Sequence, residues 1–264
     1  MIRRFIIATL LLLAATSAHA GFYTDIWYRL GQPGFGYNLV QTDDYIFVTF
    51  FIYGPDGGKP TWYIAALQRQ QNGTFTGELS ETRGTFWANP WAGYTETVVG
   101  TATFAPADNF YQGTFSYTVP GVGTSTVPVE RQTLLSQDLT GVYAGGMGGQ
   151  YTGCTNSADN YKYSDFYDLT VTQLTSSDAT FQFDFITGTG TLSCTLSGAL
   201  VQNGLLYRMP DATYSCSGGN GTPFDTTAQM TQIKWTSQGI EGQYFAPTTP
   251  GGCQEFGYFS AAIL

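Results

Sequence analysis

Apolar and polar residues alternate along short segments over most of the chain after residue 21. Phe115, Tyr117 and Val119, for example, are separated by single polar residues, and Phe181, Phe183 and their neighbours repeat the pattern. Successive side chains of a strand point to opposite faces, so a period of two indicates strands with one buried and one wet face. No stretch has apolar residues at helical spacing over three turns. The pattern predicts an all-β protein with almost no helix.

Glycine, asparagine, aspartate and proline separate these segments and predict the turns. Hairpin signals lie at Thr42-Asp43-Asp44, Asn72-Gly73 and Asn203-Gly204. In the first half, strands are expected near 22–30, 35–41, 44–53, 60–68, 73–81, 96–104, 111–119 and 122–131. In the second half they are expected near 139–145, 163–174, 179–187, 190–200, 204–216, 226–236, 239–246 and 254–262. The polar segment 132–138 is the natural boundary between the halves.

Eight short sequential strands suit an up-and-down barrel. We therefore predict two tandem barrels of about eight strands each, an aromatic-rich one over residues 21–132 and a second one over 138–264. An outer-membrane barrel is the alternative, since it also has alternating strands and many aromatic residues. Four cysteines, polar outer faces on many strands and the long loop 146–160 argue against it.

The hairpin at 44–68 is apolar on both faces. Tyr45, Phe47 and Phe51 alternate with Phe50, Ile52 and similar residues. A barrel interior buries one of these faces, so the other needs a cover, because large exposed apolar patches are rare on monomers. We expect Phe50, Ile52 and their neighbours to meet the second domain or a second copy of the chain, which makes the protein a monomer or a homodimer.

Residues 1–20 have the pattern of a secretory signal peptide. Arg3 and Arg4 precede an apolar run that is too short for a membrane span, and Ala18-His19-Ala20 is a small-x-small cleavage pattern. We expect cleavage after Ala20 and a secreted or periplasmic protein that is not embedded in a membrane. His19 is the sole histidine of the sequence, so the mature chain lacks imidazole altogether.

Composition narrows the chemistry further. Charged residues are 11% of the chain, and 19 acidic residues outnumber 10 basic ones, which argues against a nucleic-acid partner. Without histidine, Ser-His-Asp and Cys-His catalysis and histidine-ligated metals are not expected. We expect no enzyme activity, no cofactor and no metal. The spacing of Asp159, Asn160, Asp165 and Asp168 is not that of a calcium loop.

The four cysteines are Cys154, Cys194, Cys216 and Cys253, all in the second half. An even number in an exported chain predicts two disulfides, with a four-thiolate zinc site as the rival. Cys194 and Cys216 lie on the two arms of the Asn203-Gly204 hairpin at similar distances from the turn. Cys154 follows the first strand of its domain and Cys253 precedes the last, and these strands are neighbours in a closed barrel. We expect the pairs Cys194–Cys216 and Cys154–Cys253.

The first half resembles a recurring module of secreted proteobacterial proteins with the pattern D-x-W, G-W-G-x-N-x-x-Q, an aromatic strand, and G-x-P-x-W. Phe35 stands where tryptophan is usual in this pattern. The second half resembles the cysteine-bearing lipocalin-like domain that often follows the module. The resemblance implies secretion and lipocalin- or avidin-like barrels, and it lends no catalytic residues. It is carried by residues 23–27, 33–41, 45–53, 58–63, 99–104 and 129–131 in the first half, and by Gly198, 214–216, Gly221 and Gly239 in the second.

The segment 85–94 is the best candidate for a binding site in the sequence. It breaks the strand pattern and carries Phe86, Trp87, Trp91 and Tyr94. Aromatic side chains on a loop stack on sugar rings or hold apolar ligands, although they can also plug a barrel mouth. Trp27, Asn38 and Trp62 are further candidates near that mouth, with a role in the core as the alternative.

Three functions remain open from the sequence. The first is non-catalytic binding of an apolar small molecule or a glycan. The second is a structural or surface-interaction protein whose barrels are plugged by side chains. The third is a carboxylate-based hydrolase, for which Glu78, Glu81, Glu130 and Asp184 are the best-placed acids, although nothing in the sequence pairs two of them.

Overall fold

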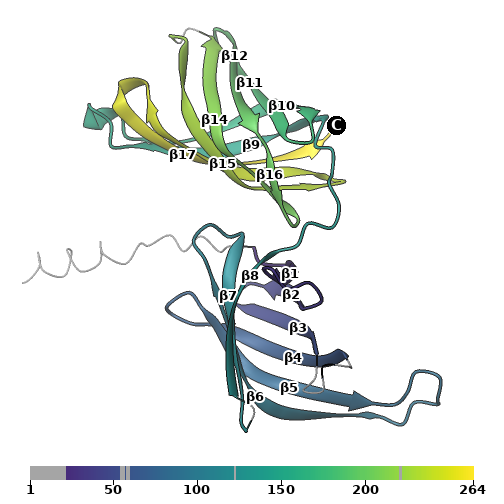
Figure 1. Ribbon diagram of the computed structural model, residues 1–264. Coiled ribbons are helices and arrows are strands. Elements are labelled where there is room, and N and C mark those ends of the chain that lie inside the picture. The colour runs from purple at the N-terminus through teal and green to yellow at the C-terminus, as the bar shows by residue number, and fades with distance from the viewer. Residues whose placement is uncertain (1–21, 54–56, 58–59, 122, 220–221) are drawn as a thin grey trace, which may run out of the picture.

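The computed structural model describes residues 22–53, 57, 60–121, 123–219 and 222–264. The chain folds into two β-barrels, one after the other, as predicted from the alternation of the sequence (Figure 1). The expected signal peptide lies outside the described residues and stays a prediction. In the part of the chain that is described, no helix is long and apolar enough to cross a membrane.

The N-terminal barrel consists of eight antiparallel strands, each paired with the next in sequence. It closes where the first strand pairs with the eighth, at Trp27–Arg131 and its neighbours. The strands are β1 (Asp25–Arg29), β2 (Gly36–Thr42), β3 (Tyr45–Tyr53), β4 (Pro60–Arg69), β5 (Phe75–Gly84), β6 (Tyr94–Pro106), β7 (Gln112–Val119) and β8 (Gly123–Arg131).

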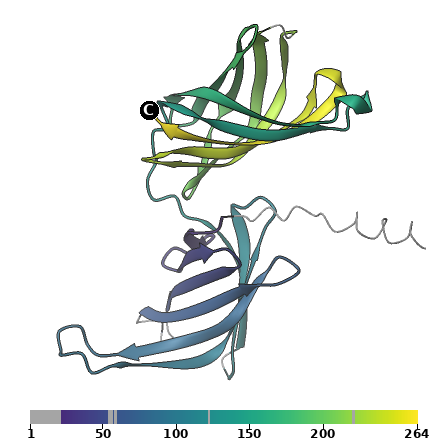
Figure 2. The same ribbon diagram turned by 180° about the vertical axis from the view of Figure 1, so that it is seen from behind.

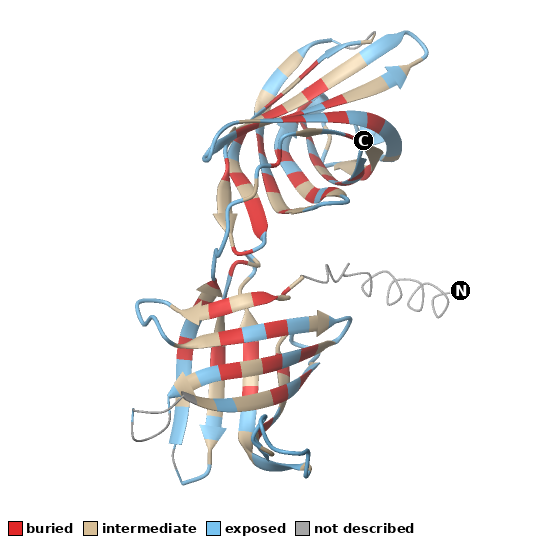
Figure 3. Ribbon diagram, turned by 90° about the vertical axis from the view of Figure 1, so that its right-hand side faces the viewer, coloured by how far each residue is buried: buried red, intermediate tan, exposed pale blue. Residues whose placement is uncertain are grey.

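Aromatic rings fill the interior of this barrel. Buried and exposed residues alternate along its strands (Figure 3). Tyr37 stacks on Phe115 with ring centroids 4.5 Å apart, Phe115 lies 4.9 Å from Phe104, and Phe104 lies 5.2 Å from Trp27. Each of these side chains is fully buried. Such a stack packs the centre of a small barrel with side chains.

The C-terminal barrel repeats the same topology. Each long strand pairs with the next along the chain, and the first and last strands, β9 and β17, pair to close it. The strands are β9 (Gly141–Thr152), β10 (Lys162–Thr175), β11 (Asp178–Thr187), β12 (Gly190–Ala199), β13 (Val201–Asn203), β14 (Leu206–Gly218), β15 (Phe224–Thr236), β16 (Gly239–Thr249) and β17 (Cys253–Ile263). The short β13 pairs only with the start of β14, while β12 pairs directly with the rest of β14.

Both predicted disulfides are present. Cys194 and Cys216 are paired residues of β12 and β14, and Cys154 joins the loop after β9 to Cys253 at the start of β17. No free cysteine remains among the described residues. Disulfides persist in oxidising compartments and are rare in the cytosol, so they are typical of an extracytoplasmic protein.

The two barrels contact each other through the turn between β13 and β14. The backbone N–H of Leu205 donates to Asp25 Oδ2 over 2.8 Å, and the N–H of Gly204 donates to Thr133 Oγ1 over 3.0 Å. A second contact is made by Tyr111, whose hydroxyl accepts from the N–H of Gln232 over 2.9 Å. The second barrel therefore sits against the β1–β8 side of the first (Figure 2).

The outer face of the 44–68 hairpin differs from the expectation. Phe50 is buried in the first barrel with Ile46 and Val48, while Phe51 and Trp62 lie outside with ring centroids 4.7 Å apart. The assignment of Phe50 and Ile52 to the outer face is therefore wrong. The second barrel leaves the outer rings exposed, because it contacts the β1–β8 side instead. Cover by a second copy stays a prediction.

Candidate functional site

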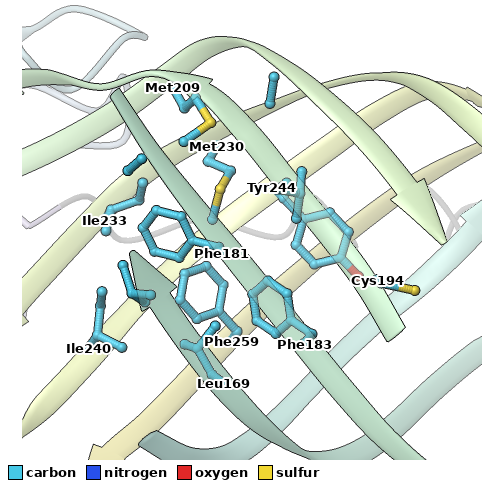
Figure 4. Close-up of a cluster of buried hydrophobic side chains, with 14 of the residues drawn as sticks. Leu169, Phe181, Phe183, Cys194, Met209, Met230, Ile233, Ile240, Tyr244 and Phe259 are labelled. Atoms are coloured by element: carbon cyan, nitrogen blue, oxygen red, sulfur yellow. The ribbon is translucent and has the colours of Figure 1, made fainter. Parts of the chain in front are cut away.

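One half of the C-terminal barrel is packed solid and the other half is hollow. Phe181, Phe259, Ile233 and Ile240 form part of the packed core (Figure 4). This part lies near the linker, since Tyr207, the cross-strand partner of Ile233, accepts a hydrogen bond from the N–H of Gln137. Beyond this core lies a cavity of about 1080 Å³. Its walls include Met147, Tyr151, Tyr163, Tyr167, Phe183, Phe185, Leu192, Leu196, Tyr214, Tyr244 and Glu255. The cavity is at the end of the barrel that carries both disulfides.

Two paired glycines shape one wall of the cavity. Gly149 of β9 lies opposite Gly257 of β17, with Tyr163 next to the first and Tyr244 next to the second across the sheet. A Cβ atom at Gly149 would lie 2.4 Å from the Tyr163 hydroxyl, and one at Gly257 would lie 2.5 Å from the Tyr244 ring. The absence of side chains at both positions therefore lets the two rings lean over the strands toward each other.

The two tyrosines converge on a buried carboxylate. Glu255 of β17 is 2% exposed, two residues before Gly257 on the same inward face. Tyr163 Oη donates to Glu255 Oε1 over 2.6 Å, and Tyr244 Oη donates to the same oxygen over 2.9 Å. The two hydroxyls also contact each other. Within the described residues, Glu255 Oε2 is buried and accepts no hydrogen bond.

Burial and this carboxylate together hold the neighbouring tyrosines in their neutral form. The pKa of Tyr163 and Tyr151 is raised far above the ordinary value. Burial is the larger cause, and the negative charge of Glu255 raises the pKa further. The same two causes raise the pKa of Tyr214 and Tyr244. The phenols act as neutral hydrogen-bond donors at physiological pH.

The cavity opens between β10 and β11. Their pairing ends at Asp168–Asp184, although β10 begins at Lys162 and β11 continues to Thr187. Phe166 and Ile186 line the opening and are exposed. A smaller hollow of about 450 Å³, lined in part by Cys194, Cys216 and Cys253, shares part of the same wall. The two disulfides thus brace the rim of the cavity.

The predicted aromatic loop does not cover a barrel mouth. It connects β5 and β6 of the first barrel, and the end of this hairpin extends away from the rest of the barrel (Figure 1). Trp87 is 88% exposed, and Phe86, Trp91 and Tyr94 are also exposed. The plugging role considered from the sequence is therefore wrong for this loop, and ligand binding by it stays a prediction.

The other three candidates in the first barrel are not brought together. Trp27 is fully buried in the aromatic core, where its Nε1–H donates to the carbonyl of Tyr23 over 3.0 Å. Trp62 and Asn38 are exposed on the outer face of the sheet. Trp27 is thus a core residue, and the proposed grouping of these residues at a mouth is wrong, because the register of β1 turns Trp27 inward while Asn38 and Trp62 point outward.

The acidic candidates also lie apart from one another. Glu130 accepts a hydrogen bond from Tyr28, and Glu81 contacts Arg83, both in the first barrel. Asp184 and the pair Asp165 and Asp168 line the cavity of the second barrel. In the part of the chain that the structure describes, no three His, Cys, Asp or Glu side chains group closely enough to hold a metal ion.

Glu255 was not singled out from the sequence, although a signal for it exists. In β17 the positions Glu255, Gly257, Phe259 and Ala261 have the same parity, and the last two are inward apolar residues. An acidic residue in phase with buried positions is a candidate for a functional group, since unpaired buried charges are costly. Strand periodicity without the barrel does not reveal which residues Glu255 meets.

Comparisons with known proteins identify no family. No protein-family model matches the sequence, and no curated protein matches it. Among solved structures, a Bacteroides fragilis protein provisionally named an outer membrane protein aligns over 89% of this chain and 96% of its own, with 15% identity and a TM-score of 0.31. A Nostoc punctiforme protein of unknown function from the DUF3598 family aligns over 91% and 96%, with 11% identity and a TM-score of 0.27. Neither likeness is close enough to assign a function to this chain.

Proposed function

We propose that this is an extracytoplasmic, non-catalytic binding protein, and that its C-terminal barrel holds a small, largely apolar molecule. The observation that carries the proposal is the cavity of about 1080 Å³, with aromatic walls and a single buried carboxylate. Ligand sites are typically concave, mostly apolar, and furnished with a few polar groups that orient the ligand.

The contrast between the two barrels supports this choice. The first barrel is filled by a continuous stack of aromatic rings, whereas the second stops its packing at Phe183 and Phe259 and leaves the space beyond them. Interiors of folded proteins are close-packed, and an open cavity of this size leaves its apolar walls without packing contacts. A fold that keeps such a void braced by two disulfides is well suited to a guest molecule.

A second candidate function is attached to the aromatic loop of the first barrel. Phe86, Trp87 and Trp91 are exposed together on an extended hairpin. Rings presented in this way suit stacking on a glycan or contact with another surface. This role is compatible with ligand storage in the second barrel.

Binding can be tested with the neutral apolar dye N-phenyl-1-naphthylamine, whose fluorescence rises in apolar surroundings. We expect saturable binding of one dye per chain. Leu196→Trp and Leu192→Trp place an indole in the cavity wall and should weaken binding at least tenfold. Leu174→Trp makes the same change at an exposed position of the same barrel and serves as the control.

The fold of each variant is checked by far-UV circular dichroism. Absence of dye binding by the unmodified chain, or equal binding by all three variants, would contradict a ligand site in this cavity. If Leu196→Trp fails to fold, Leu192→Trp at the rim decides the question, because Leu192 is only partly buried.

A further inference from the structure

We propose that the ligand of the C-terminal barrel is an organic cation whose ammonium group pairs with Glu255. The inference rests on the proposed function, and it specifies the chemical class of the molecule that the cavity takes. It follows from the state of the carboxylate, the charges around the cavity and the arrangement of the aromatic walls.

Two tyrosines hold and orient the carboxylate of Glu255, but in the part of the chain that is described only one of its two oxygen atoms accepts a hydrogen bond. Oε1 accepts two phenolic hydrogen bonds, from Tyr163 and Tyr244, which is an arrangement suited to an ionised carboxylate. Oε2 is as deeply buried and accepts no hydrogen bond within the described residues, although the hydroxyls of Tyr151 and Tyr214 also lie near the carboxylate. A buried acceptor without a partner is unfavourable, and more so when it is charged. An ammonium N–H from a ligand would satisfy it.

The cavity supplies no positive charge of its own. Of the described residues that line it, four are acidic, namely Asp165, Asp168, Asp184 and Glu255, and none is lysine or arginine. A buried carboxylate without a counter-ion is strongly unfavourable, and neutral phenols compensate only part of that cost. The missing counter-ion is best supplied by the guest.

The walls near Glu255 suit a cation as well. Tyr151 is the cross-strand partner of Glu255, and its ring centroid lies 5.4 Å from that of Tyr163. The Tyr214 and Tyr244 rings lie 6.2 Å apart on the other side. The faces of aromatic rings attract ammonium groups, most strongly where water is excluded. Phe183, Phe185 and Leu196 form the apolar part that would hold the body of the ligand.

The rim favours entry of the same class of molecule. Asp165 and Asp168 lie at the gap between β10 and β11 and are exposed. Clusters of one sign at a cleft raise the local concentration of the opposite ion and speed its association. Anionic ligands such as fatty acids would meet repulsion both at the rim and at Glu255.

The test compares three molecules that share one ring system. Tryptamine carries an ammonium group, 3-ethylindole is its neutral counterpart, and indole-3-propionate is an anion. Binding to the full chain is measured by displacement of N-phenyl-1-naphthylamine and by calorimetry. We expect tryptamine to bind at least tenfold more tightly than 3-ethylindole, and indole-3-propionate to bind most weakly.

Two substitutions isolate the role of the buried charge. Glu255→Gln keeps the size and the hydrogen-bond acceptor but removes the charge, and it should lower tryptamine affinity at least tenfold while changing 3-ethylindole less than threefold. Glu241→Gln removes one charge from an exposed position of the same barrel outside the cavity, and it should leave both affinities unchanged.

Equal binding of tryptamine and 3-ethylindole, or tighter binding of indole-3-propionate, would overturn the inference while dye binding keeps the proposed function intact. If the dye fails to bind as well, the proposed function itself is wrong. If Glu255→Gln does not fold, the comparison of the three molecules with the unmodified chain still decides the matter.

Discussion

The guanidinium of Arg131 joins several parts of the first barrel at a single buried position. It contacts Asp25 Oδ2 over 2.9 Å, donates through Nε to the carbonyl of Phe110 over 2.9 Å, and stacks over Trp27 at 4.9 Å. Asp25 Oδ2 in turn accepts the N–H of Leu205 from the second barrel. One ion pair therefore closes the first barrel between β1 and β8 and fixes the tip of the β13–β14 turn.

Removing one partner of this pair should be costly. Asp25→Ala leaves a buried guanidinium unpaired, and such changes destabilise by roughly 3–5 kcal/mol. We expect a loss of that size in the free energy of unfolding, measured by urea denaturation at pH 7. Arg83→Ala breaks the exposed pair with Glu81 and should cost under about 1 kcal/mol. Equal losses for the two variants would contradict a structural role for Asp25.

The buried tyrosines predict a loss of stability at high pH. Their folded-state pKa is raised above the ordinary value near 10, so the stability they contribute is fully present below pH 10 and declines as the pH rises beyond it. For each such tyrosine we expect a loss of roughly 1 kcal/mol by pH 11.

Urea denaturation at pH 8, 10 and 11, with phenolate absorbance followed at 295 nm, checks this expectation. The buried tyrosines should ionise only as the chain unfolds. Ionisation of all 18 tyrosines in one reversible step near pH 10, without loss of stability, would disprove it.

Among the secondary-structure elements, the loops at one end of the second barrel are fixed by covalent links. The Cys154–Cys253 disulfide joins residues 99 positions apart and links the β9–β10 loop to β17. The Cys194–Cys216 disulfide joins residues 22 positions apart and links β12 to β14. A cross-link removes conformations from the unfolded chain, and it removes more of them when the enclosed loop is longer.

We expect the double variant Cys154→Ala/Cys253→Ala to lose more stability than Cys194→Ala/Cys216→Ala. The loop-closure relation gives about 4.7 kcal/mol for the first pair and about 3.4 kcal/mol for the second. Urea denaturation of the two variants measures the difference. The reverse order would mean that local packing around Cys194, rather than the length of the loop, dominates.

At the scale of the whole molecule, the two barrels have separate hydrophobic cores. They touch through a few hydrogen bonds and through cation–π contacts such as Arg208 over the Tyr111 ring. Only the second contains disulfides. A reductant should therefore lower the stability of the second barrel and leave the first nearly unchanged.

Hydrogen exchange followed by mass spectrometry, with and without dithiothreitol, reports on each barrel separately. Peptides from β10–β17 should lose protection under reducing conditions, while peptides from β2–β7 should keep theirs. Equal loss in both barrels would show that the two fold as one cooperative unit.

The exposed rings on the first barrel predict weak self-association. Phe51 and Trp62, with Phe47 and Tyr53, form an apolar stripe on the outer face of β3 and β4. Sedimentation velocity over a range of concentrations should detect association that Trp62→Thr weakens. Thr126→Val on the opposite wall, at an exposed position of β8, changes a surface residue elsewhere and should have no such effect. Concentration-independent monomers would contradict the prediction.

Local sequence patterns determined the strands, the turns and the covalent links. The proximity of Cys194 to Cys216 follows from two alternating segments on either side of Asn203-Gly204. The register of the turn, which pairs Asn203 with Leu206, would place Cys194 opposite Ser215, and the break between β12 and β13 shifts the pairing by one residue to Cys216. The strand predicted near 139–145 is longer in the structure. β9 continues to Thr152 through a glycine-rich stretch, because glycines that are poor in isolated strands are accommodated where neighbouring rings lie over them.

Two features were decided only by the tertiary structure. In β3 both faces are apolar, so periodicity could not choose between them, and closure of the barrel turned Phe50 inward and Phe51 outward. The candidate site depends on residues from β9, β10, β16 and β17, which meet only because the first and last strands of the second barrel pair. Alternation identifies which side chains share a face, whereas the cavity depends on the pairing of strands far apart in the chain, such as Gly149 with Gly257. The hydrogen bond from Tyr163 to Glu255 likewise joins residues 92 positions apart.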